Sequence, residues 1–337
     1  MDNSGYDIIS SIWKISNTYE FEKICLDVFH FQYTHNAVYR RFFHSLHKNE
    51  DSVKTINDIP FLPIHLYKSH DIISSTFEPD IIFESSGTTE SLVSRHLVRD
   101  TKIYELSFTK TFERFYGPAK QYCILGLLPS YLERGKSSLV YMVNDLMQQS
   151  QHQQNGFYLY EHAKLAEVIK RNIIEKIPTL LIGVTYALID FAMEYPMPFK
   201  NTIVIETGGM KGRKKELLRE EVHQILKAQW QLNTIHSEYG MTELLSQAYS
   251  KEKGIFTCPP WMMVLTRQED DPFNISQPHK MATGIGNIID LANVFSCSFI
   301  ATDDIIKIHN GGSFEVIGRA DHTDLRGCNL MVPQQVG

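Results

Sequence analysis

The spacing of hydrophobic residues divides the chain into three parts. Near the amino end, apolar residues such as Phe21, Cys25 and Val28 recur at helical intervals, which predicts amphipathic helices with Cys25 in the core. From Asp80 onward, short apolar runs alternate with longer amphipathic stretches. After about residue 280 the helical spacing stops, and short apolar runs between turn residues predict strands. Asn310–Gly312 is the expected turn of a hairpin in that last part.

The middle part predicts strands and helices in alternation. Apolar runs predict strands at DIIFE (80–84), QYCILGLLP (121–129), TLLIGVT (179–185) and NTIVIETGG (201–209), and the second of these is expected to be buried. Amphipathic runs predict helices at TKIYELSFTKTFERFYG (101–117), which Gly117 stops, at ALIDFAMEY (187–195) and at RKKELLREEVHQILKAQW (213–230).

This order of elements predicts an α/β fold with a mostly parallel sheet. We expect a helical segment over residues 1–78 packed on the core, an α/β core over 79–280, and a small β-rich region of the same domain over 281–337.

Composition narrows the class of protein. The 337 residues are 43% hydrophobic and 21% charged with a net charge of −6, which is typical of a globular protein and argues against a nucleic-acid partner. The amino end lacks a secretory signal, and no apolar run is long and unbroken enough to predict a transmembrane segment. Five cysteines without a CxxC pair argue against a zinc cluster and favour free thiols in the cytoplasm.

A run of small polar residues, Ser85-Ser86-Gly87-Thr88-Thr89, follows the first predicted strand. Hydroxyl groups and unobstructed backbone N–H groups at the end of a strand suit phosphate. The run is not a Walker A loop, because only one glycine is present and no lysine follows closely. Taken alone, it is more typical of a solvated connection than of a phosphate loop.

Two further stretches place small or polar residues after predicted strands. Gly208 and Gly209 end the strand at 201–209, where an open α/β sheet binds ligands. A second break falls at Gly240, and Thr242 and Glu243 come just beyond it. A hydroxyl beside a carboxylate suits phosphate with magnesium, because Mg²⁺ prefers one or two carboxylates and takes its other ligands from phosphate and water.

The last part adds Thr302 and Asp303 at the end of an apolar strand, where a carboxylate suits ribose hydroxyls, and Gly318-Arg319 beyond it. In this order the stretches resemble the adenylate-forming superfamily, which joins carboxylic acids to AMP. The matching motifs are its Ser/Thr/Gly phosphate loop, its Tyr-Gly-x-Thr-Glu motif (Tyr239-Gly240-Met241-Thr242-Glu243), its ribose-binding aspartate motif, and its hinge-proximal motif, Gly318-Arg319 with Asp321.

The resemblance implies a large adenylate-forming domain that uses ATP and Mg²⁺. It implies nucleotide contacts from Ser85, Ser86, Gly87, Thr88, Thr89, Gly208, Gly209, Tyr239, Gly240, Met241, Asp303 and Arg319. It implies that Glu243 is the metal ligand and that Thr242 and Glu243 act in catalysis. His236 is a candidate base, although a lone histidine is more often structural, and Tyr239 is either an adenine platform or a core aromatic residue.

Within that superfamily the chain is similar to the LuxE-type acyl-protein synthetases. The similar stretches are GLLPSYLERGKSSLVYM (126–142), EYGMTELLSQAYS (238–250) and LRGCNLMV (325–332). Such enzymes move a fatty acyl group from the adenylate to a cysteine near their carboxyl end and then to a partner reductase. Cys328 stands at the matching position, and Arg326 would favour its thiolate if the two lie close in space. The other interpretation of Cys328 is a small buried residue in a terminal strand.

Two features depart from the superfamily pattern. Glu90 stands where a glycine usually follows the second threonine, and its carboxylate would repel a triphosphate. No lysine follows Lys307, so we expect the mobile carboxy-terminal lid with its catalytic lysine to be absent. Groups such as Mg²⁺, Arg319 or His236 would then meet the charge of the transition state.

Three alternatives stay open for the function. A coenzyme A ligase would release the acyl group on coenzyme A, and a loading enzyme would place it on a carrier protein. A degenerate nucleotide-binding scaffold is favoured by Glu90 and by the missing lysine.

Overall fold

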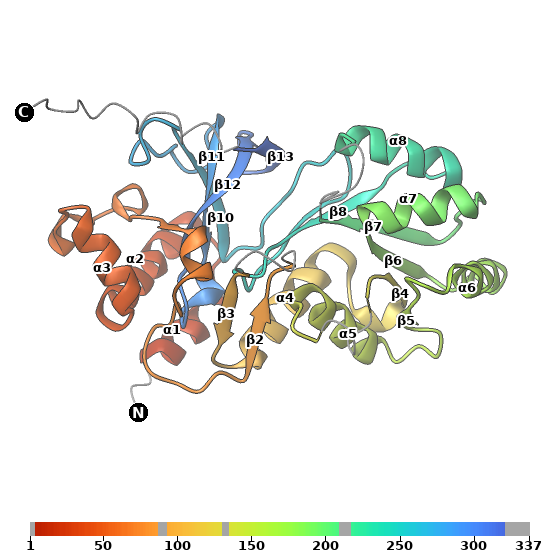
Figure 1. Cartoon of the computed structure of the whole chain (residues 1–337), viewed down its shortest axis with the longest axis horizontal. Helices are drawn as coiled ribbons and strands as arrows, with labels where there is room; N and C mark the ends of the chain where they lie inside the picture. Colours follow the sequence, from red (N-terminus) through yellow and green to blue (C-terminus); the bar gives the residue numbers. More distant parts are fainter. Residues whose placement is uncertain (1–3, 87–92, 130–134, 209–216, 321–337) are drawn as a thin grey trace, which may run out of the picture.

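The computed structural model describes residues 4–86, 93–129, 135–208 and 217–320. Figure 1 shows two lobes side by side, each built on a sheet, with the hairpin of β2 (Ile81–Glu84) and β3 (Arg95–Val98) between them. We call them the α/β lobe, which holds β4–β9, and the β-rich lobe, which holds β1 and β10–β13.

The α/β lobe is built on a six-stranded sheet with the order β5-β4-β6-β7-β8-β9. Neighbouring strands are parallel from β5 to β8, and β9 is antiparallel to β8. The strands are β4 (Cys123–Leu127), β5 (Gly156–Phe157), β6 (Thr179–Val184), β7 (Thr202–Thr207), β8 (His236–Tyr239) and β9 (Ala248–Ser250). The predicted α/β fold with a parallel sheet is therefore confirmed.

Helices cover both faces of this sheet, as Figure 1 shows. They are α4 (Thr101–Tyr116), α5 (Ser138–Ser150), α6 (His162–Ile174), α7 (Thr185–Glu194) and α8 (Arg219–Trp230). In β4, Ile124 joins one hydrophobic cluster with residues of α4 and α5, while Cys123, Leu125 and Leu127 join a second cluster with residues of α6, α7 and α8. A sheet buried on both faces explains why the strands read as continuous apolar runs.

Local sequence sets the ends of two of these helices. Gly117 ends α4 with a φ of 80°, a backbone conformation that favours glycine, so the predicted stop is confirmed. The helix predicted from residue 213 begins only at Arg219 within the described residues, so the prediction for Leu217 and Leu218 is wrong. The Glu221 carboxylate accepts a hydrogen bond of 2.8 Å from the Leu218 N–H, which fixes the turn there.

The β-rich lobe is built on a five-stranded sheet in which β12 pairs with β1, β11 and β13. Its strands are β1 (Leu62–Pro63), β10 (Met262–Arg267), β11 (Ala282–Asp290), β12 (Phe299–Ile308) and β13 (Phe314–Arg319). Three helices at the amino end pack against this lobe: α1 (Ser4–Ile12), α2 (Thr18–His35) and α3 (Ala37–Ser45). The hairpin predicted at Asn310–Gly312 is confirmed, and Gly311 and Gly312 have φ values of 91° and 90°.

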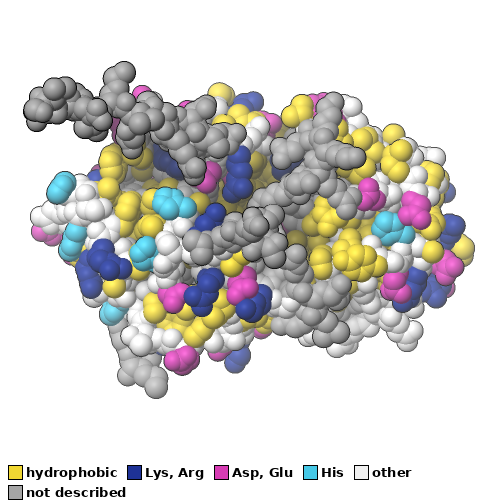
Figure 2. All heavy atoms as spheres, in the orientation of Figure 1, with side chains coloured by type: hydrophobic (Ala, Val, Ile, Leu, Met, Phe, Trp, Pro, Cys, Tyr) yellow, Lys and Arg dark blue, Asp and Glu magenta, His cyan; other side chains and the backbone are white. Residues whose placement is uncertain are grey.

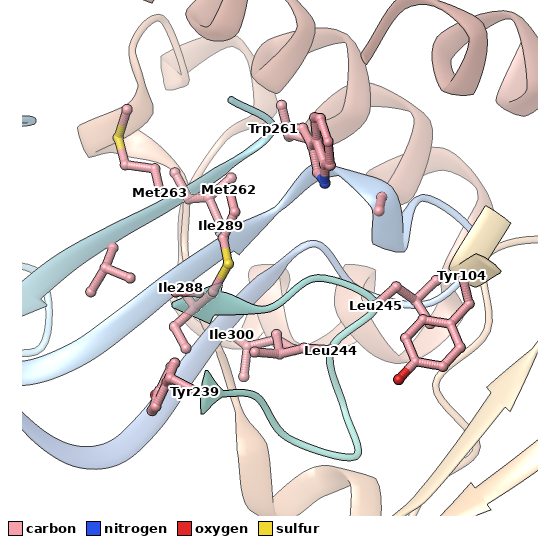
Figure 3. Packing of buried hydrophobic residues seen from close by; sticks show 14 of the residues in the cluster. Tyr104, Tyr239, Leu244, Leu245, Trp261, Met262, Met263, Ile288, Ile289 and Ile300 are labelled. Atoms are coloured by element: carbon pink, nitrogen blue, oxygen red, sulfur yellow. The ribbon is translucent and has the colours of Figure 1, made fainter. Parts of the chain in front are cut away.

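The two lobes share one hydrophobic cluster. Figure 3 shows Tyr239 and Leu244, from the end of β8 and the segment after it, beside Met262, Ile288 and Ile300 of the β-rich lobe. Cys25 also belongs to this cluster and is fully buried, as predicted. The shared core fixes the segment after β8 at the junction of the lobes.

Within the described ranges no helix is both long and apolar enough to cross a membrane.

Candidate active site

The hairpin between the lobes presents the predicted phosphate loop. It consists of β2 (Ile81–Glu84) and β3 (Arg95–Val98), which pair antiparallel. The Ser85 N–H donates to the Ser94 carbonyl at 3.1 Å, and the Ser94 N–H donates to Ser85 Oγ at 3.0 Å. These bonds close the base of the loop. Ser86 is exposed beside it, and the predicted residues Gly87, Thr88 and Thr89, with Glu90, lie outside the described residues.

Charged side chains surround this hairpin. Figure 2 shows lysine, arginine, aspartate and glutamate side chains gathered over it, and Lys136 Nζ lies 2.7 Å from Glu84 Oε1. Arg95 also pairs with Asp71 at 3.0 Å. Each of these partners is partly exposed, so the pairs contribute about 0–1 kcal/mol each to stability.

The segment after β8 carries the Tyr-Gly-x-Thr-Glu motif and is tied down by buried side chains. His96 Nδ1 of β3 lies 2.8 Å from the Thr242 carbonyl oxygen, and the Asn293 side-chain amide donates to the Glu243 carbonyl at 2.8 Å. Glu243 itself is 6% exposed. The Asp290 carboxylate accepts hydrogen bonds from the backbone N–H groups of residues 245 and 246, at 2.7 and 3.0 Å.

Tyr239 and Arg319 meet at an aspartate next to the predicted one. The Tyr239 hydroxyl donates to Asp304 Oδ2 at 2.7 Å, and Arg319 Nε lies 3.4 Å from Asp304 Oδ1. Burial raises the pKa of Tyr239 well above its usual value, and the Asp304 carboxylate adds to the shift, so the hydroxyl stays protonated. Asp303, the predicted ribose ligand, accepts a hydrogen bond of 2.7 Å from the Ala320 N–H at its carbonyl.

The two predicted glycines that the structure describes are required for different reasons. Gly208 ends β7 with a φ of 77°, and its carbonyl accepts a hydrogen bond from Thr185 Oγ1 at 2.9 Å. A side chain at Gly208 would meet no neighbouring atom, so the left-handed backbone alone favours glycine there. A Cβ at Gly240 would lie 2.5 Å from Glu238 Oε1, so close packing favours glycine at that position. Gly209 lies outside the described residues.

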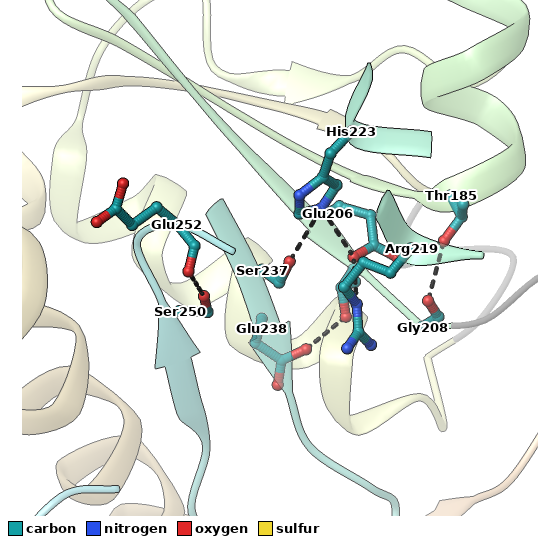
Figure 4. A network of polar contacts seen from close by, with 10 residues as sticks. Thr185, Glu206, Gly208, Arg219, His223, Ser237, Glu238, Ser250 and Glu252 are labelled. Carbon is teal, nitrogen blue, oxygen red and sulfur yellow. Dashed lines mark hydrogen bonds and ion pairs between the residues drawn. The ribbon is translucent and has the colours of Figure 1, made fainter. Parts of the chain in front are cut away.

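Two buried glutamates near the carboxyl ends of β7 and β8 were missed by the sequence reasoning (Figure 4). Thr185 Oγ1 donates to Glu206 Oε1 at 2.5 Å, and the Thr207 hydroxyl donates to the Glu238 carboxylate. Burial raises the pKa of Glu238 to about 7, and the charge of Glu206 adds to the shift. In the sequence, Glu206 stands two residues before Gly208, and Glu238 stands two residues before Gly240. That spacing from a predicted site glycine could have identified both glutamates.

The environment of Glu206 is different. Burial acts to raise the pKa of Glu206, but contacts from His223 and Arg219 on α8 and from Thr185 outweigh it, so the pKa is lowered. Arg219 Nε lies 3.7 Å and His223 Nε2 lies 3.9 Å from Glu206 Oε2. The side chain is therefore a carboxylate near neutral pH beside a Glu238 that is only partly ionised.

His236 lies at the other end of the sheet from the motif residues. It begins β8, its ring stacks on Tyr116 with centroids 5.7 Å apart, and Nδ1 lies 3.2 Å from the Tyr116 hydroxyl oxygen. Burial lowers the pKa of His236 to about 4, with Lys251 also opposing its charge. The ring lines an open cavity of about 640 Å³ at the amino ends of β6, β7 and β8. The structure thus does not bring His236 together with Glu243, and its role as a base stays a prediction.

Magnesium at Glu243, the predicted metal ligand, would need further ligands from the nucleotide. No cluster of three or more histidine, cysteine, aspartate or glutamate side chains occurs in the part of the chain that the structure describes. Those residues therefore contain no site in which three or more such side chains would hold a cation. One protein carboxylate is enough for Mg²⁺ when phosphate oxygens and water supply its other ligands.

Comparison with known structures defines the class of fold. ATP-bound MatB from Rhodopseudomonas palustris has a TM-score of 0.54 and 16% identity, with 73% of this chain and 49% of the MatB chain covered. The 2-hydroxyisobutyryl-CoA ligase in complex with 2-HIB-AMP has a TM-score of 0.61 and 11% identity, with 90% of this chain and 69% of that chain covered. The fold is that of adenylate-forming enzymes, and the chain spans about half the length of MatB.

Residues 14–337 match the family model of the acyl-protein synthetase, LuxE. The chain therefore belongs to the LuxE family. No curated protein sequence matches it at a significant level.

Proposed function

We propose that this protein activates a carboxylic acid with ATP and passes the acyl group to a thiol. The observation that carries the proposal is the contact between His96 and Thr242, which lie 146 residues apart. It joins the Ser85–Ser94 hairpin to the Tyr239–Glu243 motif in a fold shared with adenylate-forming enzymes. Membership of the LuxE family supports the same chemistry.

The proposed reaction has two steps. The acid carboxylate attacks the α-phosphorus of ATP, the bond to the β-phosphate oxygen breaks, and pyrophosphate leaves. A thiolate then attacks the carbonyl carbon of the acyl-adenylate, and AMP leaves with the bridging oxygen. In this proposal Glu243 holds Mg²⁺, which would supply positive charge to the phosphates, and Asp303 binds the ribose hydroxyls.

The Ser85–Thr89 loop, Gly208–Gly209 and Arg319 remain proposed nucleotide contacts. Within the proposal Thr242 binds phosphate. Tyr239 packs in the shared core against Phe256 and Phe314, which favours the core aromatic residue among its two interpretations. The hydrogen bond from Tyr239 to Asp304 fixes the orientation of that ring. We assign His236 no step, because it lies at the opposite end of β8 from the motif.

The proposed first acceptor is Cys328. Its support is the position of Ala320, which the Asp303 carbonyl fixes beside the proposed ribose site. Cys328 is the eighth residue after Ala320, and a chain of that length reaches at most about 28 Å. The described cysteines are free but buried or partly buried, and free thiols agree with the expected reducing cytoplasm. A fatty acid is the proposed substrate, and a partner reductase the proposed final acceptor.

Acid-dependent exchange of labelled pyrophosphate into ATP tests the proposed function. The protein is incubated with ATP, Mg²⁺, labelled pyrophosphate and one acid at a time, from short to long fatty acids and aryl acids. We expect label in ATP with at least one acid and none without acid. No exchange with any acid, together with no ATP binding, would support the scaffold alternative instead.

A further inference from the structure

His96 connects the two loops of the proposed active site. It lies on β3, one residue beyond Arg95, and pairs with Phe83 across the hairpin. Its ring is 1% exposed and reaches the Thr242 carbonyl with Nδ1, at 2.8 Å, and Asn293 Oδ1 with Nε2, at 3.0 Å. A single buried side chain thus spans from the base of the phosphate loop to the motif after β8.

Asn293 extends this connection to Glu243. Its side-chain amide donates to the Glu243 carbonyl at 2.8 Å and to the Cys297 carbonyl at 3.0 Å. Both donors of the amide are used, which turns its oxygen towards His96. Asn293 is 1% exposed, so no solvent replaces these bonds when one partner is removed.

The state of the His96 ring follows from its partners. The Thr242 carbonyl and Asn293 Oδ1 both accept only, so each of the two ring nitrogens faces an acceptor oxygen. Donation at both nitrogens would need a charged ring, which burial opposes by lowering the pKa of His96 to about 4. A neutral ring therefore donates its single N–H to one of the two oxygens, and the shorter contact, at 2.8 Å, is the one from Nδ1 to the Thr242 carbonyl.

We propose that His96 and Asn293 are positioning residues that clamp the Thr242–Glu243 peptide to the β2–β3 hairpin and so hold Glu243 in place for the proposed binding of Mg²⁺. This inference rests on the proposed function and adds residues that the family motifs do not contain. The clamp holds two successive backbone carbonyl groups, those of Thr242 and Glu243. The backbone that carries the Glu243 side chain is therefore fixed in orientation. Loss of the clamp is expected to weaken the binding of Mg²⁺ and ATP while the lobe stays folded.

Conservative and disruptive substitutions of His96 separate positioning from packing. An asparagine places its amide nitrogen near the position of Nδ1, so His96→Asn keeps the donor to Thr242, whereas His96→Phe keeps the ring volume and removes the donor. We expect His96→Phe to raise the Mg²⁺ concentration for half-maximal exchange and the KM for ATP by at least ~10-fold, and His96→Asn to recover most of that loss. Binding of Mg·ATP, measured by calorimetry, should show the same order.

Asn293→Leu has a matched control in Asn172→Leu. Both asparagines are 1% exposed, and Asn172 of α6 donates to Thr179 Oγ1 at 3.0 Å at the start of β6, away from the motif. We expect both variants to lower thermal stability, and only Asn293→Leu to weaken Mg·ATP binding. Equal Mg·ATP binding in wild type, His96→Phe and Asn293→Leu would overturn the clamp while leaving the proposed function intact. Failure of the wild-type protein to bind Mg·ATP or to catalyse exchange would overturn both.

Discussion

Replacement of Glu243 by alanine is expected to lower acid-dependent pyrophosphate exchange at least ~100-fold, a few kcal/mol of lost transition-state contact. The buried carboxylate would hold the Mg²⁺ of Mg·ATP, and no cluster of three or more ligating side chains in the described ranges offers a substitute. Glu243→Gln should lose nearly as much, because it keeps the volume and removes the charge. Asp303→Ala should give a similar loss through the ribose hydroxyls.

The control for these variants is Glu22→Ala, an exposed glutamate on α2. It should keep wild-type exchange, and all variants should be compared at matched folded fractions from circular dichroism. Near-normal exchange in both Glu243→Gln and Asp303→Ala would reject the assignment of the motifs.

Loss of protein-bound acyl label in Cys328→Ser is the second large effect that we expect. With a labelled acid, ATP and Mg²⁺, the wild-type chain should carry a thioester that hydroxylamine removes, and the variant should carry none. The reactive species is a thiolate, which burial disfavours. Burial raises the pKa of every described cysteine thiol, to about 11 for Cys123, to about 12 for Cys258 and Cys297, and well above its usual value for Cys25.

Cys258→Ser is the matched control, since Cys258 is the described cysteine that is not fully shielded from solvent. It should keep the label. Label that survives in Cys328→Ser would exclude that residue as the acceptor. Label that appears only on added coenzyme A would favour the ligase alternative.

The parts of the fold that were predictable depend on local signals. Gly117 terminates α4 through its own backbone conformation, and the buried strand β6 is visible as an unbroken apolar run. The helices α5 and α6 were not predicted, although their apolar residues recur at helical spacing, as Leu165, Val168 and Ile169 do in α6. The start of α8 was placed too early, since Leu218 is apolar but 70% exposed.

The motif residues of the site were visible in the sequence, but their connections were not. His96 stands in a short strand with no feature that points to Thr242, because the contact spans 146 residues. The pairing of Thr207 with Glu238 likewise depends on the register of β7 and β8. Asp303 and its neighbour Asp304 are equivalent in the sequence, and only the fold shows that Tyr239 binds the second of them.

Transfer of an oxygen atom from the acid to AMP tests the central claim most directly. The wild-type protein is incubated with Mg·ATP, hydroxylamine as acyl acceptor, and a carboxylic acid labelled with ¹⁸O in both oxygens. If the acid attacks the α-phosphorus, mass spectrometry will find labelled AMP in an amount equal to the acyl hydroxamate formed. Label in orthophosphate, or unlabelled AMP formed together with hydroxamate, would contradict an acyl-adenylate.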